Sequence, residues 1–124
     1  MLAWIKHGLR AANTVPVAIP EVPPSLDQLV EKVRRWGDDR LITKNSTPAA
    51  QLLKCMSELG ELSDATLKCD REEIVDGVGD VIVTLIMYAA TQGVCPRMCL
   101  EIAYDAIKDR KGYLTPEGVF VKEE

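Results

Sequence analysis

The amino-acid sequence predicts an all-α protein: a bundle of three to four helices whose core is completed by homo-oligomerisation. Apolar residues recur at helical spacing in four segments, and a capping residue or a proline stands at the start of each. Aromatic residues make up only 5% of the chain, so the core must be aliphatic. Because 124 residues bury a small core, and because one segment is apolar nearly all round, association with further copies is expected.

Residues 1–24 are predicted to form a leader and a linker before the helical domain at residues 25–124. Four prolines in the second half of this segment are typical of an extended linker. The opening lacks the apolar region of a secretory signal, because Lys6 and Arg10 interrupt it. A frayed leader is favoured at residues 1–12, with a basic amphipathic targeting or surface helix as the alternative.

The first two helices have clear starts. Ser25 begins a capping box before the first helix, which is predicted to end at Gly37. Residues 38–46 are polar and are expected to form a connection. Thr47 then provides an N-cap, and Pro48 takes the first helical position, where its missing N–H costs nothing. The apolar stripes of the two helices are expected to comprise Leu26, Leu29, Val30, Val33 and Trp36, and then Leu52, Leu53, Met56, Leu59, Leu62 and Leu67.

The third helix is predicted to run from its N-cap, Asp70, to about Gln92, with Gly93 just past its end. Its second half, Val81–Ala90, is apolar nearly all round, which is typical of a helix buried in a bundle or an oligomer interface. The β-branched residues there also suit a strand, but continuity with the capped acidic half favours a helix. The run is far shorter than the ~20 apolar residues of a membrane-spanning helix.

A fourth helix is predicted to open at Pro96 and to close at Gly112, after a group of bases suited to a helix C-terminus. A turn at Thr115–Gly118 and a short extended tail at Val119–Val121 follow. The inward-facing residues of this helix are expected to be Met98, Ile102, Ala103, Ala106 and Ile107.

Composition narrows the classes of function. The formal net charge of -4 argues against a general nucleic-acid binder, and no segment suits a membrane anchor. The four cysteines form no C-x-x-C pair and the chain has one histidine, so no zinc–thiolate site is expected. We expect reduced cysteines packed on the helices of a cytoplasmic protein.

Acidic residues concentrate in one window. Residues 54–80 hold eight acidic and three basic side chains, an excess larger than the net charge of the whole chain. Glu58 and Glu61 lie three apart on the second helix and therefore project from one face. Three acids share a face of the third helix for the same reason: Glu73, Asp76 and Asp80.

The two acidic faces are expected to meet, because a short turn near Asp70 should pack the helices antiparallel with both groups at a similar height. Crowded carboxylates repel unless they are protonated or bind a hard divalent cation, and Mg²⁺ or Mn²⁺ prefers such oxygen ligands. Gly77 and Gly79 interrupt the helix beside the acids and would leave room for a metal ion, water or ligand. A solvated acidic face is the alternative, with Lys54 paired to Glu58 rather than to phosphate.

The segments Lys54–Leu62 and Asp76–Val83 resemble the MazG-like, all-α nucleoside triphosphate pyrophosphohydrolases. That family carries an E-x-x-E pair on one helix and an E-x-x-D pair on the next. The end of the chain, Ile107–Gly112 with Gly118–Val121, is similar to the tail of short, phage-type members. The resemblance spans residues 26–122.

The resemblance implies a Mg²⁺-dependent hydrolase, with Mn²⁺ as a possible substitute, that converts a (deoxy)nucleoside triphosphate to the monophosphate and pyrophosphate as a homodimer or homotetramer. Two positions depart from the family pattern: Ser57 stands where a second acid is common, and Gly77 stands at the first acid of the second pair. A non-catalytic helical oligomerisation or partner-binding module with a degraded acidic site is therefore the alternative function. The residues implied are Glu58 as catalytic base and metal ligand, Glu61, Asp76, Asp80 and Glu73 as metal ligands, and Lys54, Lys108, Arg110 and Lys111 as phosphate ligands.

Overall fold

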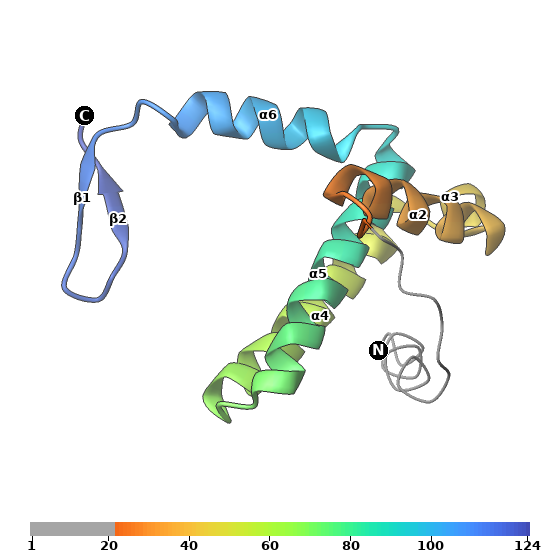
Figure 1. The fold of residues 1–124 in the computed structure, drawn as a ribbon, viewed down its shortest axis with the longest axis horizontal. Coiled ribbons are helices and arrows are strands. Elements are labelled where there is room, and N and C mark those ends of the chain that lie inside the picture. Colours follow the sequence, from red (N-terminus) through yellow and green to blue (C-terminus); the bar gives the residue numbers. More distant parts are fainter. Residues whose placement is uncertain (1–21) are drawn as a thin grey trace. The chain divides into compact units, whose positions relative to one another are not determined.

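The structure, a computed structural model, describes residues 22–124; the predicted leader and linker at residues 1–24 lie outside the described residues up to residue 21. The described part is mostly helical, which confirms the all-α prediction, and it ends in a two-stranded hairpin (Figure 1). It forms two compact units, one ending at Gly93 and one spanning Val94–Glu124. The elements are α2 (Leu26–Asp39), α3 (Ile42–Asn45), α4 (Pro48–Leu67), α5 (Arg71–Gln92), α6 (Pro96–Ile107), β1 (Gly112–Leu114) and β2 (Phe120–Lys122).

The helix starts agree with the sequence. Ser25 Oγ accepts a hydrogen bond from the Gln28 N–H at 3.2 Å, and Gln28 Oε1 accepts one from the Ser25 N–H at 2.8 Å, so the capping box is complete. Thr47 caps α4 and Asp70 caps α5, each by accepting a hydrogen bond from the backbone N–H three residues on. The two long helices, α4 and α5, therefore begin at the residues that the sequence predicted.

Two boundaries in the first unit differ from the prediction. Gly37 does not end α2, which continues to Asp39. Gly37 is buried, and a Cβ there would lie 2.8 Å from Met87 Cε, so this glycine allows close packing on α5. The predicted polar connection also contains the short helix α3, whose N-cap Leu41 adopts a left-handed conformation with a φ of 61°.

The second unit differs at its C-terminal end. α6 ends at Ile107, and Gly112 lies in β1, opposite Lys122 of β2, instead of closing the helix. A Cβ on Gly112 would collide with the Val121 carbonyl oxygen, so glycine is required by strand pairing rather than by a helix end. No residue of α6 is buried, so the second unit itself does not cover the predicted inward face, and the partner of this face stays a prediction.

α4 and α5 lie side by side and form the centre of the first unit (Figure 1). The predicted leucine stripe of α4 does not face the core: the side chains of Leu53 and Met56 are 66% and 61% exposed. The small residues Cys55 and Ala65 of α4 are buried instead, together with Glu58, and the small ones let the two helices approach closely. The buried hydrophobic residues are Cys55 and Ala65 of α4 and Val83, Ile86, Met87 and Ala89 of α5.

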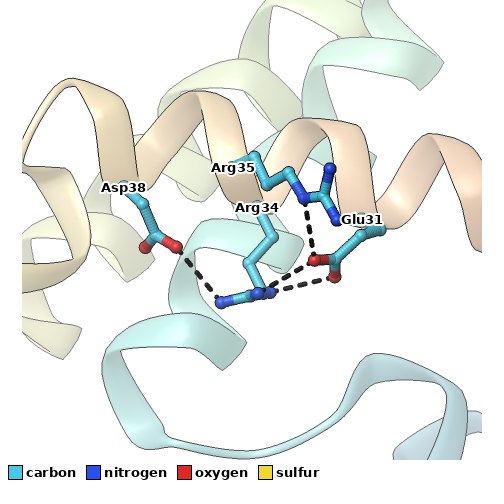
Figure 2. Close-up of polar contacts among 4 residues, drawn as sticks. All are labelled: Glu31, Arg34, Arg35 and Asp38. Atoms are coloured by element: carbon cyan, nitrogen blue, oxygen red, sulfur yellow. Dashed lines mark hydrogen bonds and ion pairs between the residues drawn. The ribbon is translucent and has the colours of Figure 1, made fainter.

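The outer face of α2 carries a cluster of ion pairs (Figure 2). Arg34 contacts Glu31 at 2.9 Å and Asp38 at 3.2 Å, and Arg35 contacts Glu31 at 3.2 Å. Hydrogen bonding from the Arg34 guanidinium holds the pKa of Glu31 below its usual value. Because Arg34, Arg35 and Asp38 are exposed and the Glu31 side chain keeps 43% of its surface in solvent, the cluster marks a solvated face of α2.

The cysteines were predicted to be reduced and packed on the helices. All four cysteines are free thiols, but Cys55 is buried whereas Cys69, Cys95 and Cys99 are exposed. The prediction that the cysteines pack on the helices is therefore confirmed for Cys55 alone.

Within residues 22–124, α5 is by length and composition able to cross a membrane. A core helix has the same length and composition, and α5 packs against α4.

Candidate functional site

The turn between α4 and α5 decides which side chains of the two helices face each other. Lys68 caps α4, and its backbone N–H donates to the Asp64 carbonyl at 3.1 Å. Cys69 then adopts a left-handed conformation with a φ of 54°, and Asp70 caps α5. A connection this short returns α5 along α4, as predicted.

An open pocket of about 170 Å³ lies between these two helices near the turn. Each wall consists of side chains on successive turns of one helix. Apart from one lysine and one glycine, every residue that lines the pocket is a carboxylate. The lining residues are Glu61, Asp64 and Lys68, and then Glu73, Asp76, Gly77 and Asp80.

The structure therefore brings together four of the residues predicted as metal ligands. Their exposure differs along the pocket: Glu61 and Glu73 are exposed, Asp76 is half-buried, and Asp80 is only 3% exposed. The pocket thus leads from solvent to a buried carboxylate on α5. Carboxylates this crowded repel one another, and a bound divalent cation would relieve the repulsion.

Glu58 does not line this pocket, although it lies one turn before Glu61 on α4. Its side chain is fully buried, and the Lys54 ammonium lies 3.3 Å from Glu58 Oε1. The Lys54 side chain is 35% exposed, so this ion pair extends from the interior to the surface. The geometry gives Lys54 a partner within α4 and places the predicted catalytic carboxylate next to the pocket rather than in it.

The two glycines beside the acids have different surroundings. A Cβ on Gly77 would lie 3.0 Å from Leu62 Cδ1 and 3.3 Å from Leu62 Cβ, closer than most van der Waals contacts. A Cβ on Gly79 would meet no atom within 4 Å. The space expected for a ligand at Gly77 is thus filled by Leu62, and an acid at this position would require Leu62 to move.

The three remaining basic residues predicted to bind phosphate belong to the second unit. The Lys108 ammonium forms an ion pair with Asp105 of α6 at 3.2 Å. Arg110 and Lys111 are exposed between α6 and β1. Phosphate binding by these three residues stays a prediction.

Asp64 and Lys68 line the pocket but were not predicted as site residues. Asp64 lies three residues after Glu61, and Lys68 lies four residues after Asp64. The helical spacing that singled out Glu58 and Glu61 therefore extends to both residues and was the signal that could have found them.

The donor set fits a hard divalent cation, because the carboxylates of the pocket supply only oxygen ligands. Between residues 22 and 124, no three His, Cys, Asp or Glu side chains lie close enough together to form a metal-binding cluster. Binding would therefore require the exposed carboxylates of Glu61 and Glu73 to move toward Asp80.

Comparison with known sequences gives a partial match. No protein-family model matches the chain. An uncharacterized 18.2 kDa protein from the rep-hol intergenic region of Haemophilus phage HP1 is 36% identical over 64 residues. These residues make up 52% of this chain, and the chain spans 39% of the length of that phage protein.

Comparison with solved structures reveals the same fold. A MazG-like pyrophosphohydrolase of cyanophage S-2L, bound to dGDP and three catalytic Mn²⁺ ions per active site, superimposes with a TM-score of 0.62. The match covers 82% of this chain and 100% of that chain, at 19% sequence identity. The two chains therefore share the MazG-like, all-α fold that the sequence resemblance implied.

Proposed function

We propose that this protein is a nucleotide pyrophosphohydrolase that cleaves a (deoxy)nucleoside triphosphate to the monophosphate and pyrophosphate. The observation that carries the proposal is the pocket between α4 and α5, where carboxylates of two helices line one opening. The solved structure with the same fold belongs to a pyrophosphohydrolase bound to a nucleotide and Mn²⁺, which supports the same chemistry here.

Four pocket residues, Glu61, Glu73, Asp76 and Asp80, are the proposed ligands of Mg²⁺ or Mn²⁺. A bound divalent ion neutralises phosphate charge and lowers the pKa of bound water. Asp80, which is buried on a rigid helix, fixes the deep end of the ligand set. The exposed carboxylates supply the adjustable ligands, because their side chains can change rotamer in solvent.

In the proposed reaction, water attacks the α-phosphorus, the bond from that phosphorus to the bridging oxygen breaks, and pyrophosphate leaves. A carboxylate must accept the proton of the attacking water within hydrogen-bond reach or through one water. Glu58 is buried beside Lys54, so it fills this role only through a bridging water. An exposed pocket carboxylate such as Glu61 needs no such relay.

Exposed apolar side chains on both long helices support a homodimer or homotetramer. On α4, Leu53 and Met56 are more than half exposed, and on α5 Val75 and Leu85 are 59% and 47% exposed. Apolar surface of this kind on adjacent helices is typical of an interface between subunits. Association would bury Leu53 and Met56, which the α4–α5 contact leaves uncovered.

The glycine at position 77 favours a second candidate function, that of a non-catalytic helical oligomerisation module. Gly77 stands where the resembled family has an acid, and a longer side chain there would require Leu62 to move. In this alternative the acidic pocket is a degraded site, and the exposed apolar faces carry the function.

Release of pyrophosphate from a panel of ribo- and deoxyribonucleoside triphosphates, with Mg²⁺ and with Mn²⁺, tests the proposal. We expect turnover of at least one nucleotide. Asp80→Asn should reduce turnover by about 100-fold or more, since even supporting contacts of a metal site cost about 10- to 100-fold in affinity or activity. Asp39→Asn, at the exposed end of α2, is the control and should retain activity. No turnover by the unmodified protein with either ion would favour the oligomerisation module.

A further inference from the structure

We infer that Lys68 contacts the phosphate chain of the nucleotide in this pocket, an inference that rests on the proposed function. Lys68 brings the one ammonium group to a pocket whose other charged lining residues are carboxylates. A nucleoside triphosphate adds several negative charges to the same place. A cation at the rim would attract the phosphate oxygens that the carboxylates repel.

Lys68 differs from two lysines that were predicted to bind phosphate, because both of those form ion pairs. Lys54 lies 3.3 Å from a Glu58 oxygen, and Lys108 lies 3.2 Å from an Asp105 oxygen. In the described part of the chain, Lys68 forms no such pair. Asp64 precedes Lys68 by four residues on the same helix, which is the favoured spacing and order for an acid–lysine pair. The Lys68 ammonium is thus left available to a ligand.

The position of Lys68 in the fold also suits this role. Its backbone is fixed by the hydrogen bond from its N–H to the Asp64 carbonyl at the end of α4. Its side chain is exposed at the pocket, so the ammonium can move while the backbone stays in place. An ammonium is a compact point charge with three rotatable donors, which suits phosphate oxygens whose position changes along a reaction.

If Lys68 served only as a counter-ion to the carboxylates, its substitution would have a different effect on binding. As a counter-ion alone, Lys68 would only reduce repulsion among Glu61, Asp64 and the α5 acids in the pocket. Its removal would then tighten the binding of Mn²⁺ and leave the affinity for polyphosphate unchanged. As a phosphate contact, Lys68 adds charge-assisted hydrogen bonds to the polyphosphate, and its removal weakens polyphosphate binding.

Calorimetric titration of the full chain with inorganic tripolyphosphate, with Mn²⁺ in excess, separates these roles without any turnover. Lys68→Gln should weaken tripolyphosphate binding about tenfold, the equivalent of one hydrogen bond to a charged group. Lys68→Glu should weaken it further, and Lys68→Arg should retain most of it. Lys32→Gln, a change at an exposed lysine of α2 away from the pocket, is the matched control and should bind like the unmodified protein.

The inference is overturned if Lys68→Gln binds tripolyphosphate as tightly as the unmodified protein, or if the unmodified protein binds none. Its failure is distinguishable from failure of the proposed function. If the unmodified protein releases no pyrophosphate yet binds tripolyphosphate through Lys68, the proposed activity fails and the phosphate contact stands. If the protein is active, Lys68→Gln should raise KM for the nucleotide and leave kcat nearly unchanged.

Discussion

The two halves of the α4–α5 pair use the same two helices for different purposes. Near the turn, charged side chains of both helices line an open pocket. Toward the other end, α5 contributes Val83, Ile86 and Met87 to a closed core, and Gly37 of α2 packs against that end. Ligand binding and fold stability are therefore divided along the length of the helices, with Asp80 at the boundary.

The largest expected effect comes from the closed half. Ile86→Ala, at a side chain 5% exposed, should lower the free energy of unfolding by about 2–5 kcal/mol, because it leaves a cavity between helices. Urea denaturation followed by circular dichroism measures the change. Leu67→Ala, at a side chain 82% exposed near the turn, is the control, and its effect should stay within about 0.5 kcal/mol. Equal losses from both variants would contradict the division between the two halves.

The next largest effect concerns the pocket half. Mn²⁺ at about 100 times its Kd should raise the free energy of unfolding by about 2.7 kcal/mol, because the ion binds the folded state. Glu73→Gln removes a pocket carboxylate and should lose much of this gain. Glu72→Gln changes the adjacent exposed acid, which does not line the pocket, and should retain the full stabilisation by Mn²⁺. Thermal melting with and without Mn²⁺ measures the gain; identical gains in the two variants would exclude Glu73 from the ligand set.

Two glycines of α5 test how tightly the pocket half is packed. Gly77→Ala places a Cβ against Leu62 and should destabilise the fold by about 1–3 kcal/mol through overpacking. Gly79→Ala meets open space and should stabilise the helix by about 0.5–1 kcal/mol, because alanine loses less backbone entropy on folding. Denaturant titrations of the two variants should shift in opposite directions, and a shared direction would refute the contact described at Gly77.

The smallest expected effect lies outside both halves, in the exposed ion-pair cluster of α2. Arg34 lowers the pKa of Glu31 in the folded state, so the stabilisation is present above the unfolded value near 4.5 and is lost as pH falls through the lower folded value. Glu31→Gln should remove this part of the acid dependence of the melting temperature. High salt should reduce the difference between the two proteins, because it screens exposed charges. A pH profile unchanged by Glu31→Gln would show that the cluster contributes nothing.

The parts of the fold that could be predicted from the sequence are those that depend on near neighbours in the chain. The cap at Ser25 needs a partner three residues away, and Thr47 and Asp70 cap their helices in the same way. The buried face of α4 could not be predicted, because leucine-rich and small-residue faces have the same helical period. Which face is buried depends on how closely α5 approaches. The short elements α3 and β1 carry too few residues for a periodic signal.

The candidate site was predictable to a similar extent. Helical spacing and the short turn placed Glu61, Asp76 and Asp80 together, and all three line the pocket. Glu58 has the same spacing, but its side chain is buried beside Lys54. Helical spacing alone does not predict whether a side chain is buried. Lys68 was not predicted, because the basic residues expected to bind phosphate lay in the segments that resemble the family, as Lys54, Lys108, Arg110 and Lys111 do.

Every side chain that lines the pocket falls between Glu61 and Asp80, in one continuous segment of chain. Closing so short a loop costs little conformational entropy, and contacts this local are made early in folding. The pocket is therefore formed by a single helical hairpin, in which the chain reverses direction at Cys69. During synthesis, the walls can join as soon as α5 has formed, while the chain beyond Gly93 is still to be added.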